Sequence, residues 1–147
     1  MADDIRDRAA AALLSLVPLY YKNVMRNKRA ITGVQVAQFH TLKVLLECGP
    51  LPMSEIGDRL YISRPYMTRL ADLMIADDLV ERRPDPTDRR FINLAITEQG
   101  RKHLKSWISG YKKDLSRDLS ALECGDVEKL YTALEDVCRI LTKLQQE

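Results

Sequence analysis

Cysteines and long apolar runs are scarce in this 147-residue sequence. Its three cysteines, Cys48, Cys124 and Cys138, are an odd number without metal-ligand spacing, which argues against both a disulfide framework and a zinc site. The longest apolar stretch, residues 9–21, is broken by Pro18 and is too short to cross a bilayer. We therefore expect reduced thiols, no membrane contact and a cytoplasmic protein.

A strong excess of charge of one sign is also lacking. The 23 Lys and Arg residues and the 21 Asp and Glu residues leave a net charge of only +2, which scarcely favours a nucleic-acid partner. Only the positions of the charges along the chain can therefore indicate such a partner. The composition, 46% apolar and 30% charged, is that of one globular domain over residues 1–147.

Catalytic motifs are missing as well. The two histidines, His40 and His103, and the three cysteines form no recognisable catalytic pairing, and there is no phosphate-binding loop. A lone histidine is more often a packing or surface residue than a general base. The sequence therefore predicts a protein that is not an enzyme, and it indicates no cofactor and no metal.

Apolar residues at helical spacing occupy the N-terminal part of the chain. They follow one face from about residue 2 to residue 29, and Pro18 should kink or interrupt this helix. A second, largely buried helix is predicted over residues 34–47. It ends at the Gly49-Pro50 pair, in a segment, residues 48–52, that is predicted to be a turn.

The C-terminal part is predicted to be helical too. A long amphipathic helix starts after Thr97 as its N-cap, and a break follows at Cys124-Gly125. From residue 127 to 144 apolar residues recur every three or four positions, as a helix-packing seam requires. These helices either cap the core of one chain or meet a second copy. We favour a homodimer formed through residues 1–30 and 98–147.

Two short helices joined by a tight turn are predicted in the middle of the chain. Apolar positions 53, 56, 57 and 60 define the first helix, and positions 67, 70, 71 and 74 define the second. Tyr61-Ile62 is the turn between them. Ser63 is placed to cap the second helix, with Pro65 in its first turn.

The outer face of the second helix offers hydrogen bonds and charge to bases and phosphates in a major groove. Its candidate contact residues are Ser63, Arg64, Pro65, Tyr66, Thr68 and Arg69. The candidates for contacts with the DNA backbone are Ser54, Arg82 and Arg83. The alternative to a DNA-contacting helix is an ordinary solvent-exposed helix. On such a helix Arg69 and Asp72 would form a weak contact.

A hairpin is predicted to follow the two helices. Residues 79–83 and 91–96 alternate as strands do, around a turn at residues 84–88. The loop contains Asp88, Arg89 and Arg90. Because the minor groove has a negative potential that attracts guanidinium groups, arginines in such a loop can enter it. The two short helices and the hairpin that follows them together predict a DNA-binding region over residues 34–97.

Several motifs occur in the order typical of one family. They are Gln38-Phe39, Met53-Ser54-Glu55-Ile56, Met67-Thr68-Arg69-Leu70, Leu79-Val80-Glu81-Arg82, the wing run from Pro84 to Arg90, and Thr97-Glu98-Gln99-Gly100. With these motifs the chain resembles the multiple-antibiotic-resistance regulator (MarR) family. The resemblance implies a mainly α fold with a small β-wing (α+β), in which a winged helix-turn-helix is flanked by long N- and C-terminal dimerisation helices.

The resemblance also implies a function. Each half of a homodimer would bind one half-site of a pseudo-palindromic double-stranded operator. By the wing pattern of the family, Arg90 would enter the minor groove and Asp88 would steady it. Two positions depart from the family pattern: Pro52 replaces a Thr-like helix cap, and Asp77-Asp78 replaces a glycine that permits a positive φ.

Members of this family respond to effectors, and the resemblance implies a repressor released by a small aromatic or anionic ligand. Candidate pocket residues are Tyr20, Tyr21, Phe39 and His40, although aromatic residues at helical spacing are more often core. Two alternatives stay open: a redox-sensing regulator of the same fold, and a winged-helix protein-interaction module. We disfavour redox control because no cluster of positive charges adjoins Cys48 in the sequence.

Overall fold

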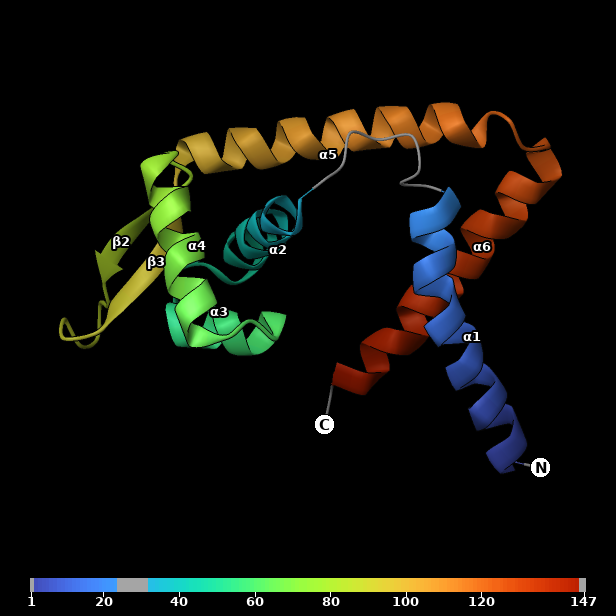
Figure 1. Ribbon diagram of the computed structural model, residues 1–147, viewed down its shortest axis with the longest axis horizontal. Helices are drawn as coiled ribbons and strands as arrows, with labels where there is room; N and C mark the ends of the chain where they lie inside the picture. Colours follow the sequence, from blue (N-terminus) through green and yellow to red (C-terminus); the bar gives the residue numbers. More distant parts are fainter. Residues whose placement is uncertain (1, 24–31, 146–147) are drawn as a thin grey trace. The chain divides into compact units, whose positions relative to one another are not determined.

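The computed structural model describes residues 2–23 and 32–145 of the chain. The chain forms two compact units (Figure 1). Unit 1 comprises Met1–Val24 and Tyr111–Glu147, and unit 2 comprises Met25–Gly110. The architecture is mainly helical with one small antiparallel sheet, which confirms the predicted fold class.

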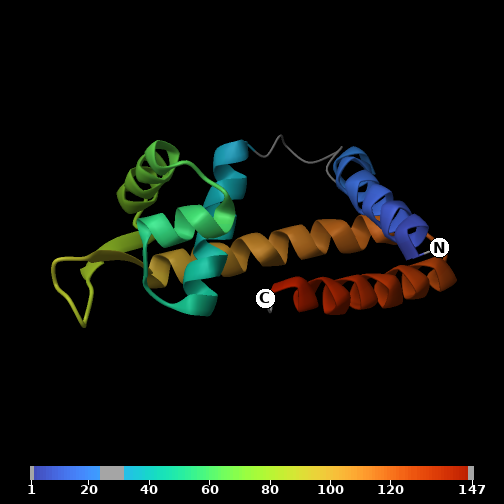
Figure 2. The same cartoon turned by 90° about the horizontal axis from the view of Figure 1, so that it is seen from below.

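Unit 2 contains the helix-turn-helix and the sheet. Its elements are α2 (Gly33–Cys48), β1 (Leu51–Pro52), α3 (Met53–Leu60), α4 (Arg64–Ala76), β2 (Val80–Pro84), β3 (Ile92–Ile96) and the first half of α5 (Glu98–Leu119). The strands are antiparallel in the order β1-β3-β2. In both views the loop between β2 and β3 projects away from α2, α3 and α4 (Figure 2). This loop is hereafter called the wing loop.

The sheet has one strand more than the sequence predicted. Leu51 and Pro52 lie in the segment that was predicted to be a turn, yet they pair with Leu94 and Asn93 of β3. A two-residue strand is too short to show alternation, and its proline is tolerated at the edge of the sheet because it need not donate to the ladder. β1 thereby ties the start of α3 to the wing.

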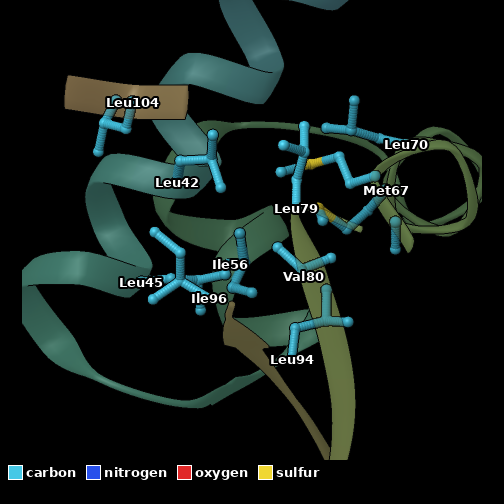
Figure 3. Close-up of a cluster of buried hydrophobic side chains, with 12 residues drawn as sticks. Leu42, Leu45, Ile56, Met67, Leu70, Leu79, Val80, Leu94, Ile96 and Leu104 are labelled. Carbon is cyan, nitrogen blue, oxygen red and sulfur yellow. The ribbon is translucent and has the colours of Figure 1, made fainter. Parts of the chain in front are cut away.

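The core of unit 2 joins one apolar stripe from each helix to the inner face of the hairpin (Figure 3). Its buried members are Leu42, Leu45, Ile56, Met67, Leu70, Ala71, Met74, Leu79, Val80, Leu94, Ile96 and Leu104. The prediction that α2 is largely buried was wrong, since only Thr41, Leu42 and Leu45 are buried in it. The other faces of α2 expose polar residues together with Leu46, so a single stripe contacts the core.

A capping box begins α2. The Thr32 hydroxyl accepts a hydrogen bond from the backbone N–H of Gln35, and the Gln35 side chain accepts one from the N–H of Thr32. Gly49 ends the helix with φ 78°, in the left-handed region that glycine adopts readily. The predicted end of this helix is therefore confirmed.

Unit 1 is helical throughout. It contains α1 (Ala2–Asn23), the second half of α5, α6 (Cys124–Leu141) and the 3-10 helix η1 (Thr142–Gln145). α1 continues through Pro18 without interruption. Its predicted extension to residue 29 lies outside the described residues.

The break between the last two long helices falls earlier than predicted. α5 ends at Leu119 and α6 begins at Cys124, so Gly125 lies in the first turn of α6 rather than in the break. The Ser120 hydroxyl donates to the carbonyl oxygen of Arg117 at 2.6 Å, and such side-chain bonds to the backbone compete with helix continuation.

Many apolar side chains of unit 1 are exposed. No residue of α6 is buried, and Leu14 and Val17 of α1 are 77% and 58% exposed. Such a density of exposed apolar groups marks an interaction surface in a folded protein. Within residues 2–23 and 32–145 no helix is long and apolar enough to cross a membrane.

Candidate nucleic-acid interface

α3 and α4 form the predicted helix-turn-helix. α3 ends at Tyr61, which has φ 54° and lies in the left-handed region, and the N–H of Ile62 donates to the carbonyl oxygen of Gly57 at 2.8 Å. A Cβ at Gly57 would lie 3.1 Å from the Ile62 oxygen and 3.8 Å from Met67. Gly57 therefore allows the two helices to approach closely.

The buried face of α4 is the predicted one. Met67, Leu70, Ala71 and Met74 are buried, so positions 64, 65, 68 and 69 face away from the core. Ser63 occupies the predicted N-cap position with extended backbone, but its side chain makes no capping hydrogen bond. Its hydroxyl is consequently not committed to the helix.

The outer face of α4 is hydrophilic and open. Ser63, Arg64, Pro65, Thr68 and Arg69 are exposed, and the half-buried Tyr66 packs against the core. The Thr68 hydroxyl donates to the carbonyl oxygen of Arg64 at 3.1 Å, which leaves its oxygen free to accept. Arg64 and Arg69 have no ion pair with any residue in the described ranges, so both guanidinium groups are available to an external partner.

Asp72 does not pair with Arg69, in contrast to what the alternative interpretation of an ordinary solvent-exposed helix assumed. Asp72 accepts a hydrogen bond from Arg82 Nη2 at 2.7 Å, which connects α4 to β2. Arg83 Nε donates to Glu81 Oε1 at 2.6 Å along the same strand. Two of the predicted DNA-backbone contacts, Arg82 and Arg83, are thus exposed but paired within the protein. The third, Ser54, is exposed at the start of α3.

The wing loop is organised by one carboxylate. Asp85 accepts hydrogen bonds from the backbone N–H groups of Thr87 and Asp88 at 2.8 and 3.1 Å and from Asn93 Nδ2 at 2.9 Å. The Asn93 amide and the two backbone donors lower the pKa of Asp85 from 3.8 to about 2. Ionised Asp85 therefore fixes the bend of the loop.

At the tip of the loop Asp88 holds Arg90. The Arg90 Nε and Nη2 atoms lie 3.0 and 2.7 Å from the two Asp88 carboxylate oxygens, a bidentate geometry. The hydrogen bond to Arg90 lowers the pKa of Asp88, and the same bond raises the pKa of Arg90. The Arg90 side chain is nevertheless 87% exposed. Arg89 is exposed beside it, with no ion pair among the residues described.

The wing should lose its order at acid pH because of Asp85. Its pKa is lower in the folded wing than the ordinary 3.8, so its stabilising contribution is present above pH 3.8 and disappears as the pH falls towards about 2. An NMR titration that follows the Asp85 carboxyl carbon and the amide protons of Thr87 and Asp88 should give one common midpoint near 2. Asp85→Asn should abolish this transition, and a wild-type midpoint near 3.8 would contradict the network.

The four predicted pocket residues lie on two helices. Tyr20 and Tyr21 make an edge-on ring contact on α1, with centroids 5.9 Å apart. On α2, the Phe39 ring contacts both His40 and Trp107 of α5, each with centroids 5.4 Å away. Phe39 thus packs in an aromatic cluster that the sequence did not reveal, because Trp107 lies 68 positions further along the chain.

A hollow of about 260 Å³ adjoins this aromatic cluster in unit 2. Its lining is Gln35, Gln38, Asp77, Leu79, Gln99, His103 and Trp107, and it includes none of the four predicted pocket residues. No group of His, Cys, Asp or Glu among the described residues could hold a metal ion.

Cys48 has a cationic neighbour that sequence proximity did not show. Arg59 Nη1 lies 3.6 Å from Cys48 Sγ, while its Nη2 pairs with Glu55 at 2.7 Å. The two residues are brought together where the end of α2 meets α3. All three cysteines are exposed and reduced.

Comparison with known proteins gives consistent matches. The model of the MarR family matches residues 32–90. The HTH-type transcriptional repressor MdtR of Bacillus subtilis (strain 168) is 33% identical over 90 residues, which are 61% of this chain and 58% of that protein. This chain therefore matches less than two thirds of the length of MdtR. The uncharacterized HTH-type transcriptional regulator YsmB of the same strain is 30% identical over 112 residues, 74% of this chain and 75% of YsmB.

The fold has counterparts among solved structures. The structure of a MarR family protein from Bacillus stearothermophilus superimposes with a TM-score of 0.69 at 23% identity, covering 92% of this chain and 97% of the other. At this level of identity the likeness concerns the fold alone.

Proposed function

Because this chain belongs to the MarR family of transcription regulators, we propose that it binds double-stranded operator DNA sequence-specifically and represses transcription there. The observation that carries the proposal is the pairing of two exposed cationic elements in one unit. α4 presents Arg64 and Arg69, and the wing loop presents Arg90 held by Asp88. The first suits the major groove and the second the minor groove. The proposed activity is binding and involves no catalysis.

We propose that the active form is a homodimer on a pseudo-palindromic operator. The exposed apolar side chains of α6, among them Leu130, Leu134 and Leu141, support a helix seam that a second copy would cover. Twofold symmetry would give each half-site its own α4 and wing.

Regulation by a small aromatic or anionic effector is part of the proposal. Tyr20, Tyr21 and His40 are exposed and remain candidates for its contacts, whereas Phe39 is engaged with Trp107. A thermal-shift screen of small aromatic acids would identify the effector through a ligand-dependent rise in the unfolding temperature.

The contact between Cys48 and Arg59 supports redox control as a second candidate mode. The Arg59 guanidinium lies 3.6 Å from the exposed Cys48 sulfur, and redox-sensing cysteines are commonly accessible thiols beside cationic side chains. Peroxide that releases DNA from the wild type but not from Cys48→Ser would favour this mode over ligand control.

Arg69→Ala and Arg90→Ala should impair DNA binding in different ways. A lost bidentate contact in the major groove costs about 1–3 kcal/mol and relaxes the preference at one base pair per half-site. Arg90→Ala should weaken binding to all sequences, change only the preference for flanking A·T content, and lower the salt slope by about one. Both effects are measured by selection from a randomised duplex library, followed by titration at two salt concentrations.

Arg101→Ala on α5 is the matched control, since it removes the same charge from an exposed position outside α4 and the wing. It should leave the selected sequence unchanged. Wild-type affinity in Arg90→Ala, or a changed preference at central base pairs only, would overturn the proposed role of the wing.

A further inference from the structure

Two non-glycine residues among those described have a left-handed backbone: Tyr61 with φ 54° and Asp78 with φ 57°. This conformation is unfavourable for any residue with a Cβ, and for a bulky side chain it is a genuine outlier. Asp and Asn tolerate it best because their short polar side chains bond locally. The two positions therefore need separate explanations.

The fold explains Asp78. Its carbonyl oxygen accepts the Thr97 hydroxyl at 2.5 Å, and its N–H donates to the carbonyl oxygen of Ile75 at 3.0 Å. These bonds fix the backbone where α4 ends and β2 begins. An aspartate there is also one of the least strained alternatives to glycine.

The fold does not explain the side chain of Tyr61. Both neighbours, Leu60 and Ile62, pack against the core, whereas Tyr61 is 97% exposed. Its backbone N–H donates to the carbonyl oxygen of Asp58, but its side chain makes no hydrogen bond or ring contact with any residue of the described ranges. An aromatic ring in water contributes nothing to packing, and here its Cβ strains the backbone. The left-handed backbone itself ends α3, where the N–H of Ile62 donates to the carbonyl oxygen of Gly57, but this role calls for a glycine or asparagine and not for an exposed aromatic ring.

Tyr61 stands beside the proposed reading helix. It is two positions before Ser63, the N-cap of α4, so its Cα lies within roughly 8 Å of the start of that helix. Arg64 and Pro65 of the first turn are exposed next to it. A helix that enters a major groove by its N-terminal residues brings the preceding turn close to a phosphate strand. Tyrosine hydroxyls are among the groups that bond phosphate oxygens.

We propose that Tyr61 is a DNA-contacting residue whose hydroxyl donates a hydrogen bond to a backbone phosphate at the edge of the groove that α4 enters. The inference rests on the proposed function. It assigns Tyr61 to positioning rather than to base recognition, because a phosphate carries no sequence information. The proposed contact accounts for a tyrosine, rather than a less strained glycine, at the end of α3.

The test compares Tyr61→Phe, Tyr61→Gly and the control Asp78→Gly on a duplex that the wild type has selected from a randomised library. Tyr61→Phe should bind about tenfold more weakly, since it loses one hydrogen bond to a charged acceptor. Its salt slope should stay unchanged, because a neutral hydroxyl displaces no counterion. This distinguishes it from Arg90→Ala.

The glycine variants separate strain from contact. Tyr61→Gly should bind at least as weakly as Tyr61→Phe, yet unfold about 2–4 °C higher because the strain is relieved. Asp78→Gly relieves the same kind of strain away from α4's first turn and should bind DNA as the wild type does. Ethylation interference should show one phosphate per half-site whose modification impairs the wild type but not Tyr61→Phe.

The outcomes are distinguishable. If the wild type selects no duplex, the proposed function itself fails. If the wild type selects a duplex and both Tyr61 variants bind it with wild-type affinity, the inference about Tyr61 is wrong. Loss of affinity in Tyr61→Gly alone, with Tyr61→Phe unaffected, would also overturn the hydrogen bond to phosphate.

Discussion

Replacing Leu130 and Leu134 together by glutamate is expected to make the chain monomeric and to weaken its binding to a two-half-site duplex by about 10²- to 10⁴-fold. That is the range by which linking two binding modules raises avidity. The two side chains are 38% and 45% exposed in the single chain, so glutamates there should not disturb its fold. In a dimer seam they would bury four unpaired carboxylates, which opposes association. Light scattering gives the mass, and titration gives the affinity.

Thr132→Glu is the matched control, because it adds a charge to an exposed position on the opposite side of α6. It should remain dimeric and bind DNA with wild-type affinity. A double variant that still dimerises would show that α6 is not the seam. A monomeric variant with unchanged affinity would show that one winged unit suffices.

The proposed dimer and the proposed Tyr61 contact would act on different parts of recognition. Dimerisation would set the spacing of two half-sites, whereas Tyr61 and Arg90 would fix how each winged unit lies on its own half-site. The Asp85 network holds the wing loop in a defined shape before any DNA arrives. Such preorganisation lowers the ordering cost of binding.

Local patterns explain why most elements of unit 2 were predictable. The spacing of Met67, Leu70, Ala71 and Met74 defines one face of α4, and a turn must precede Ser63. Asp78 has the positive φ that was expected from its place in the family pattern. The resemblance to the family's wing pattern implied the Asp88–Arg90 pair, which the structure contains.

Contacts between distant residues were not predictable in this way. Arg82 pairs with Asp72 and Arg59 lies against Cys48, in each case ten or eleven positions away across two elements. β1 has no sequence pattern of its own and exists only because β3 offers it an edge. The strain at Tyr61 is equally invisible, since the sequence shows an unremarkable tyrosine in a turn.

Gly100→Ala should destabilise the protein by about 3–5 kcal/mol, the range of severe overpacking, and so abolish DNA binding at moderate temperature. A Cβ at this position would lie 2.0 Å from the carbonyl oxygen of Leu79 and 2.9 Å from Ile96 Cγ1. The Leu79 oxygen cannot retreat freely, because it accepts the N–H of Thr97 at 3.1 Å. The Thr97 hydroxyl in turn accepts the N–H of Gly100 at 2.9 Å.

Gly110→Ala provides a control of opposite sign in the same helix. No atom lies within 4 Å of a Cβ at Gly110, so an alanine there should raise the free energy of unfolding by about 0.5–1 kcal/mol through its better helix propensity. Urea unfolding of both variants measures the two changes. If Gly100→Ala and the wild type have the same free energy of unfolding, the first turn of α5 does not pack closely against the Leu79 carbonyl. α4 and the wing would then lack the support that holds them together, since this carbonyl is where the end of α4, the start of β2 and the cap of α5 meet.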